Sequence, residues 1–393
     1  MTLRDSKTPL LAALCAALVL TLYAQELHYE TGVINIEVPV RVFDGDRFVD
    51  NLTINDFEVF ENGKPQKIVA LYLIRKTEVQ KEEAPRFTEA KLAPKIKSVP
   101  ETLRNFLLIF ELLEPMPKVN EAIDYFFRDV FYKGDQVTIV SPKGMYRFRQ
   151  ELFDQMRPAE VAGQIKRNLR KDILAGATDY RHLIQDIKDI EKNPDIDGEL
   201  KGRLIMNDVR ELRDRVTIND QGIRRLAQAL KAQEGRKIVF VFYEKEDIVI
   251  PTSKEAYSEY DLEARRPIDY NVKDIEKIFA DASITVNFIF LTSSTTSEFD
   301  ITDQRRDEGL GLADLSNSIF GAFREMSEAS GGMTESSSNA LAAFKKTVMA
   351  SENYYLLYYV PSEYKADGKF KEIKVTVKGK HYQVSNRSGY IAR

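Results

Sequence analysis

The sequence predicts an α/β fold: a mostly parallel, doubly wound sheet with helices on both faces, flanked by smaller β segments. Two observations predict it. Between residues 105 and 360, near-continuous apolar runs, typical of strands covered on both faces, alternate with segments of helical periodicity. Before residue 76 and after residue 360, apolar and polar residues alternate one by one, as they do in half-buried strands.

The N-terminal segment has the pattern of a secretory signal peptide over residues 1–24. Arg4 and Lys7 precede an apolar run of 13 residues, Leu10 to Leu22, and a suitable cleavage site follows. The run is shorter than the roughly 20 residues that a membrane-spanning helix needs. We therefore expect an exported protein, periplasmic or secreted, with no membrane span in the mature chain. An uncleaved N-terminal anchor is the alternative.

Cysteine content and charge restrict the function further. Cys15 is the only cysteine and lies inside the signal segment, so the mature chain offers neither disulfides nor thiolate chemistry. The net charge is -4, and removal of Arg4, Lys7 and Asp5 with the signal takes away a net +1 and leaves -5. A mildly acidic chain gives no reason to expect a nucleic acid or an anionic membrane as partner.

An N-terminal β module is expected over residues 25–75. Apolar residues at every second position of 34–42 have the period of a half-buried strand. Asn62-Gly63 marks a later hairpin turn. Pro39 lacks a backbone N–H, so we expect the first strand to lie at a sheet edge.

Residues 76–104 contain three prolines among mixed charges, which is typical of a linker. The α/β domain is expected over residues 105–360. Its strand candidates are Phe106–Phe110, Gln136–Val140, Lys237–Phe242, Ile284–Leu291 and Tyr354–Val360. Its helix candidates are Lys118–Tyr132, Asn271–Ala282, Gly311–Ala329 and Asn339–Ala350.

One stretch, residues 180–234, is too long for a simple crossover between two strands. Apolar residues recur there on one helical face, at Ile205, Val209 and Leu212. We expect an inserted helical hairpin, followed by the crossover helix. The final segment, 361–393, returns to alternating β structure.

Three segments carry a resemblance to a known family. They are Leu52-Thr-Ile-Asn-Asp-Phe-Glu-Val-Phe-Glu-Asn-Gly63-Lys-Pro-Gln-Lys67, residues 105–291, and Tyr354-Tyr-Leu-Leu-Tyr-Tyr-Val-Pro361, which is followed by Asp367-Gly368-Lys-Phe and by Gly389-Tyr390. They resemble the VWFA-related domain proteins of the acidobacterial type, which are exported bacterial proteins with a von Willebrand factor A-like domain. The resemblance implies a Rossmann-like von Willebrand A-type domain flanked by β modules. It implies ligand or protein binding as the function.

The resemblance also implies a divalent-cation site, the metal-ion-dependent adhesion site, built from an Asp-x-Ser-x-Ser loop, a Thr and a further Asp. Here Glu111 stands for the first Asp, while Leu113 and Pro115 stand for the two serines and offer no side-chain oxygen. A second loop, 176–179, keeps its Thr as Thr178, and Glu244 stands for the last Asp. The site is therefore predicted to be degenerate.

Two interpretations of these residues stay open. In the first, the site is vestigial, because Mg²⁺ demands near-ideal octahedral oxygen ligands. In the second, Glu111, Glu114, Thr178, Asp179 and Glu244 form a carboxylate-rich pocket, which Ca²⁺ accepts more readily than Mg²⁺ does. A divalent cation, Ca²⁺ or Mg²⁺, is thus a candidate cofactor.

A long loop after Glu244 adds candidates for partner binding. It combines charges with Tyr257 and Tyr260, and long loops in compact domains are either functional or disordered. Together with Glu114 and Asp179, these tyrosines are the predicted partner-binding residues.

Catalysis finds little support. The three histidines are dispersed, and neither a G-x-S-x-G elbow nor a P-loop is present. The first hypothesis is an exported protein-interaction module with a degenerate metal site and an unidentified protein partner. The alternative is a divalent-cation-dependent binder or hydrolase that uses Glu111, Glu114, Asp179 and Glu244. A third is a structural role, in which the β modules assemble by edge pairing.

Overall fold

The computed structural model describes residues 34–83, 103–148, 150–216, 220–244, 247–251, 270–292, 310–314, 316–379 and 381–393. The chain divides into two units, Met1–Ile34 and Asn35–Arg393, and the description below concerns the second. The predicted signal peptide, most of the predicted linker, and both Tyr257 and Tyr260 lie outside the described residues.

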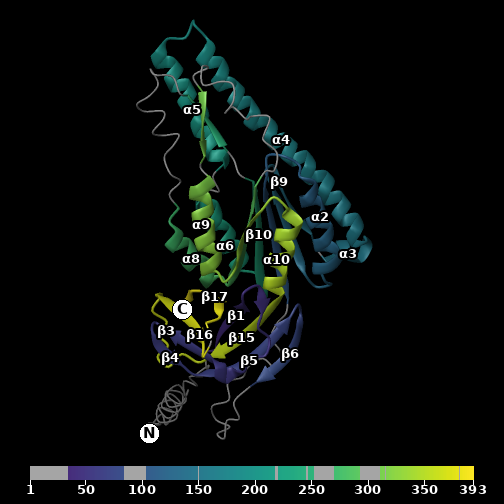
Figure 1. The fold of residues 1–393 in the computed structure, drawn as a ribbon, viewed down its shortest axis with the longest axis vertical. Helices are drawn as coiled ribbons and strands as arrows, with labels where there is room; N and C mark the ends of the chain where they lie inside the picture. The colour runs from purple at the N-terminus through teal and green to yellow at the C-terminus, as the bar shows by residue number, and fades with distance from the viewer. Residues whose placement is uncertain are drawn as a thin grey trace, which may run out of the picture. The chain divides into compact units, whose positions relative to one another are not determined.

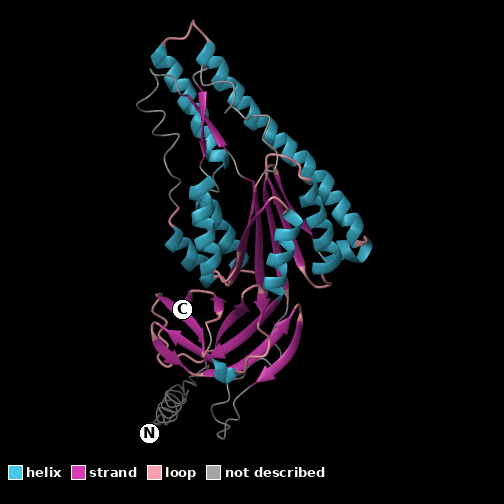
Figure 2. Cartoon of the chain, viewed as in Figure 1, coloured by secondary structure: helices cyan, strands magenta, loops and turns pink. Residues whose placement is uncertain are grey.

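The β module consists of two sheets formed by both ends of this unit (Figures 1 and 2). The first has the order β17-β1-β15-β5-β6, with β2 beside β1, and the second has the order β18-β16-β3-β4. Their strands are β1 (Ile36–Asp44), β2 (Arg47–Phe48), β3 (Phe57–Glu61), β4 (Lys64–Gln66), β5 (Ile68–Arg75), β6 (Glu78–Glu83), β15 (Asn353–Tyr359), β16 (Phe370–Val377), β17 (Gln383–Asn386) and β18 (Gly389–Ile391). A short 3₁₀ helix, η1 (Ile54–Asp56), precedes β3.

The larger of the two apolar clusters in the β module joins its two sheets into an antiparallel half-barrel. It combines residues of β1, β3, β5, β15 and β16, such as Val40, Leu71 and Leu357, which are all fully buried. Glu61 is buried there as well, and its carboxylate accepts hydrogen bonds from Tyr359 Oη (2.6 Å) and Tyr390 Oη (3.0 Å). The β module is therefore completed only when the C-terminal strands return to the N-terminal ones.

The position of the first strand differs from the prediction. β1 lies between β17 and β15, so the expected edge position is wrong. Pro39 is nevertheless tolerated, because β17 pairs only with Val40–Phe43 and leaves Pro39 a strand neighbour on one side alone. The hairpin turn predicted at Asn62-Gly63 joins β3 and β4, and both residues have positive φ, 48° and 77°.

The central layer is a mixed sheet of order β14-β12-β10-β7-β8-β9, parallel except for the β8–β9 pair. Its strands are β7 (Arg104–Glu111), β8 (Gln136–Ser141), β9 (Gly144–Phe148), β10 (Arg236–Glu244), β12 (Ile284–Leu291) and β14 (Thr334–Ser337). A two-stranded ribbon, β11 (Asp247–Pro251) with β13 (Leu310–Asp314), stands apart from it.

Helices enclose this sheet in two apolar clusters, and alternate residues of β10 enter different clusters. The helices are α2 (Pro117–Tyr125) with the π-helical turn η2 (Phe126–Val130), α3 (Gln150–Gln155), α4 (Pro158–Lys192), α5 (Gly198–Val216), α6 (Asp220–Lys231), α8 (Val272–Asp281), α9 (Ser316–Ala329) and α10 (Ala340–Glu352). Figure 1 shows α4 and α5 as an antiparallel pair. The first half of α4 packs in one cluster and the second half in the other.

The predicted fold class, a mostly parallel Rossmann-like von Willebrand A-type sheet, is wrong. Ten strand pairings of the described residues are antiparallel and four are parallel. The chain combines antiparallel sheets, including the half-barrel, with one mixed sheet. An apolar run shows that a strand is buried on both faces, but it does not reveal the direction of the strand's neighbours.

Three element predictions are wrong. The strand at Tyr354–Val360 is predicted to belong to the parallel sheet, but β15 pairs antiparallel with β1 and β5. Its sequence has the continuous apolar pattern of a buried parallel strand, because its two faces pack in two different apolar clusters of the β module. The predicted helix at Gly311–Ala329 begins instead with β13, and the predicted linker begins with β6. Among the described helices, none is long and apolar enough to cross a membrane.

Candidate functional site

The carboxyl ends of β7 and β10 lie side by side, because the two strands are parallel and Glu111 is in register with Tyr243. Glu244, the last residue of β10, is 6% exposed. Its Oε2 accepts hydrogen bonds from the backbone N–H groups of Leu113 (2.9 Å) and Glu114 (3.2 Å). Burial raises the pKa of Glu244, and these two hydrogen bonds oppose the rise. Glu244 thus holds the loop that follows β7.

Helix α4 closes against the same edge of the sheet. A Cβ added at Gly176 would lie 3.0 Å from Cβ of Pro142, in the β8–β9 turn, so glycine permits this close approach. The carboxylate of Asp172, one turn earlier on α4, accepts hydrogen bonds from Ser141 Oγ and Tyr146 Oη, both 2.5 Å long. The hydrogen bond to Asp172 raises the pKa of Tyr146 to about 12.

Two exposed ion pairs continue this contact between α4 and the strand ends. Lys143, in the β8–β9 turn, pairs with Asp179 of α4. Arg181 of α4 pairs with Glu114 in the loop after β7, at 3.6 Å between Nη2 and Oε1. The structure therefore brings Glu114, Asp179 and Glu244 to one edge of the mixed sheet, and each already interacts with another group of the chain.

Thr178 does not lie in a loop, which corrects the prediction. Residues 176–179 are inside α4, and the Thr178 side chain is exposed. Its Oγ1 donates to the Leu174 carbonyl, 2.8 Å away and one turn back. This local hydrogen bond is the one that a threonine makes within a helix, so the hydroxyl is directed to its own helix.

Glu111 differs from the other acids, because neither a hydrogen bond nor an ion pair to its carboxylate occurs among the described residues. The side chain is half-buried at the end of β7. Burial raises the pKa of Glu111 to about 7. Glu111 therefore changes its charge near neutral pH, beside a loop whose position depends on a second carboxylate.

These residues do not fit a divalent-cation site. Glu244 and the hydroxyl of Thr178 are committed to backbone groups, and Asp179 is paired with a lysine. Within the ranges that the structure describes, no group of three or more His, Cys, Asp or Glu side chains is arranged to hold a metal ion. Hard cations need several converging oxygen ligands, and such convergence is not formed here.

The surface over this edge is mixed in character. Leu174 is 42% exposed, one helical turn before Thr178. The two ion pairs involve Asp179 and Arg181, five and seven residues after Leu174 on α4, and their side chains are between 36% and 66% exposed. We call this set, Glu114, Lys143, Leu174, Thr178, Asp179 and Arg181, the recognition surface.

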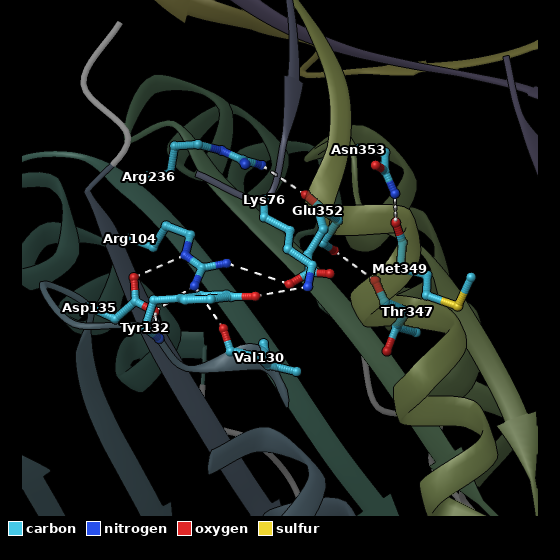
Figure 3. Close-up of polar contacts among 11 residues, drawn as sticks. Lys76, Arg104, Val130, Tyr132, Asp135, Arg236, Thr347, Met349, Glu352 and Asn353 are labelled. Atoms are coloured by element: carbon cyan, nitrogen blue, oxygen red, sulfur yellow. Dashed lines mark hydrogen bonds and ion pairs between the residues drawn. The ribbon is translucent and has the colours of Figure 1, made fainter. Parts of the chain in front are cut away.

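Sequence reasoning missed a second polar site, at the opposite end of the sheet, where β7 begins (Figure 3). Arg104 is 2% exposed and forms two hydrogen bonds to Asp135, from Nε to Oδ1 (2.9 Å) and from Nη2 to Oδ2 (2.5 Å). Arg104 Nη2 also donates to the Val130 carbonyl (2.8 Å), and Tyr132 N donates to Asp135 Oδ2 (2.7 Å). The guanidinium lies 4.9 Å from the centre of the Phe106 ring.

This buried pair lies where the β module meets the mixed sheet. Glu352, at the end of α10, places Oε1 3.7 Å from Arg104 Nη1, and burial raises its pKa. Lys76, which follows β5, donates from Nζ to Tyr132 Oη (2.8 Å), and this hydrogen bond raises the pKa of the lysine. Lys76, Arg104 and Glu352 are among the residues that line a cavity of only about 10 Å³, the size of a single water. The cluster is thus a structural junction and offers no room for a substrate.

One signal in the sequence pointed to this junction. Arg104 directly precedes the apolar run 106–110, and a charge at the start of a buried strand needs a partner. The partners follow 26 to 248 residues later in the chain, and periodicity does not identify them.

Comparisons with known proteins leave the family open. No family model matches the chain, and no curated protein matches it. Among solved structures, the chain is similar to the human COPII-coat protein Sec24c, with 8% sequence identity and a TM-score of 0.30 over 75% of this chain. The chain spans 44% of the length of that protein's chain. At this identity and TM-score, the similarity assigns neither a family nor an activity.

Proposed function

We propose that this chain is an exported protein-interaction module whose recognition surface functions without a divalent cation. The hydrogen bonds from Leu113 N and Glu114 N to Glu244 carry the proposal. In a metal-dependent adhesion site, a cation would connect these loops. Here the buried carboxylate of Glu244 connects the end of β10 with the loop after β7. The exposed surface of this edge then consists of two ion pairs and the apolar side chain of Leu174. The N-terminal signal pattern supports export.

The composition of the recognition surface suits a protein partner. Arginine is enriched among residues that dominate binding energy, and among the described residues Arg181 is held by one exposed ion pair, at 3.6 Å. Exposed ion pairs contribute little stability, so a partner carboxylate can replace Glu114 at small cost. Leu174 supplies an apolar contact beside this charge.

Thermal unfolding tests the metal-independent part of the proposal. The mature chain is unfolded in EDTA, then in millimolar Mg²⁺, Ca²⁺ or Mn²⁺. A cation at one hundred times its Kd stabilises a protein by about 2.7 kcal/mol, which is readily measured. We expect no specific shift of the midpoint. An upward shift that Glu111→Ala and Glu244→Ala remove would support the alternative, a cation-dependent binder or hydrolase using Glu111, Glu114, Asp179 and Glu244.

Cross-linked capture from an envelope extract tests the surface itself. We expect Arg181→Glu and Leu174→Asp to reduce capture of the species that the wild-type chain enriches. Matched controls are Arg203→Glu and Leu200→Asp, on α5, whose side chains are also exposed. Loss of capture in the α5 pair alone would move the binding site to the helical hairpin and refute the assignment to the recognition surface.

A further inference from the structure

A groove of about 410 Å³ lies beside β3, in the β module. Most of its lining comes from the segment Asp56–Lys67, which is not part of the recognition surface. Its size falls in the range of ligand-binding pockets, about 300–1,000 Å³. Half-buried or exposed apolar side chains line it, namely those of Ile54, Phe60, Pro65 and Ile68.

The main chain of β3 opens toward this groove. Lys378 N donates to Asp56 O (2.8 Å) and Asn62 N donates to Glu372 O (2.9 Å). Even-numbered residues of β3 therefore direct their main-chain groups to β16, and odd-numbered residues direct theirs to the other side. On that side β4 pairs with 59–61 only. Among the described strands, none pairs with Phe57 there, so one residue of this edge is unpaired, and Phe57 lines the groove.

The ionised groups of the lining favour an acidic ligand. Two lysines, Lys67 and Lys378, and one acid, Glu58, line the groove, which gives a net charge of +1. Lys378 Nζ donates to the carbonyl of Asn55 (2.9 Å), which also lines the groove. The groove thus combines one unpaired main-chain position, at Phe57, with apolar walls and positive charge.

We propose that this groove binds an extended segment of a partner protein, with alternating acidic and apolar residues, which pairs its main chain with Phe57, beyond the end of β4. Strand addition uses main-chain hydrogen bonds for affinity and alternate side chains for specificity. Phe57 offers one N–H and one C=O, the walls accept the apolar side chains, and the lysines attract the acidic ones. The groove and the recognition surface are built from different elements, so each proposal is tested without the other.

The test uses the full chain and three labelled hexapeptides in fluorescence anisotropy. The first is acetyl-(Glu-Val)₃-amide, the second carries N-methyl groups on its valines, and the third has lysine for glutamate. We expect saturable binding of the first, and about tenfold weaker binding of the second, because its main-chain donors are lost. The third should not bind measurably, since its charges oppose those of the groove. This comparison needs no variant of the protein.

Variants then locate the binding. Lys67→Glu with Lys378→Glu should weaken the first peptide about tenfold or more, while Lys171→Glu with Lys277→Glu, on exposed helix positions, should not. No saturable binding of the first peptide, or equal binding of the N-methylated one, would overturn the proposal. Binding to phosphatidylglycerol vesicles, lost in the groove variant, would replace it with a lipid surface if the peptides fail. A dimer in sedimentation that dissociates in that variant would replace it with self-pairing.

Discussion

Removing Asp135 tests whether the junction of Figure 3 is buried and paired as described. In Asp135→Ala, Arg104 keeps only the Val130 carbonyl and Glu352, whose Oε1 is 3.7 Å away. Breaking a buried ion pair by removing one partner costs about 3–5 kcal/mol, because the remaining charge is left desolvated. Tyr132 N also loses its acceptor. We expect the free energy of unfolding to fall by about 4 kcal/mol.

Urea unfolding, followed by circular dichroism, measures this change. Glu121→Ala is the matched control, because its ion pair with Lys118 is nearly half exposed and contributes at most about 1 kcal/mol. The double variant Arg104→Met/Asp135→Leu should be more stable than Asp135→Ala, since both buried charges are removed together. A loss in Asp135→Ala no larger than that of Glu121→Ala would refute the burial of Arg104.

Three further predictions concern Gly332, Glu244 and Glu111. Gly332→Ala should destabilise the chain by about 1–3 kcal/mol, because the added Cβ would lie 1.7 Å from the Val286 carbonyl oxygen. Gly321→Ala in α9 meets no atom within 4 Å and should stabilise it by about 1 kcal/mol in the same urea assay; equal effects would refute the packing. Glu244→Ala should cost about 1–3 kcal/mol, since two backbone donors lose their acceptor, and an unchanged urea midpoint would contradict this. The pKa of Glu111 is raised from 4.5 to about 7, so the folded chain binds the proton more tightly, and stability is highest below pH 4.5 and falls as the pH rises to about 7. Glu111→Gln should remove this part of the pH dependence and be more stable than wild type at pH 8, by at most about 3 kcal/mol; a parallel pH profile in the two proteins would count against it.

The candidate site shows how far sequence reasoning reached. The resemblance points to positions 111, 178 and 244, and the acids Glu114 and Asp179 belong to the same predicted loops. Of these residues, Glu114, Asp179 and Glu244 lie at one edge of the mixed sheet. Their partners were not predicted. A backbone N–H, as at Leu113, has no signature in the sequence, and the ion pair between Glu114 and Arg181 spans 67 residues. The predicted loop at Thr178 is wrong, because the helical spacing of the buried residues Ile173, Ala177 and Tyr180 continues through this position.

The local features of the fold follow from the sequence alone. Apolar periods located most strands and helices, Asn62-Gly63 fixed a hairpin, and the charge and cysteine content limited the classes of function. These features depend on a residue and its near neighbours, which a sequence states directly. Three long-range features are visible in the three-dimensional structure alone: which strands pair, the place of β15 in the β module, and the ion pair of Arg104 with Asp135. A strand that is buried on both faces has the same apolar sequence pattern whichever strand lies beside it. Contacts between residues hundreds of positions apart in the chain select the neighbouring strand.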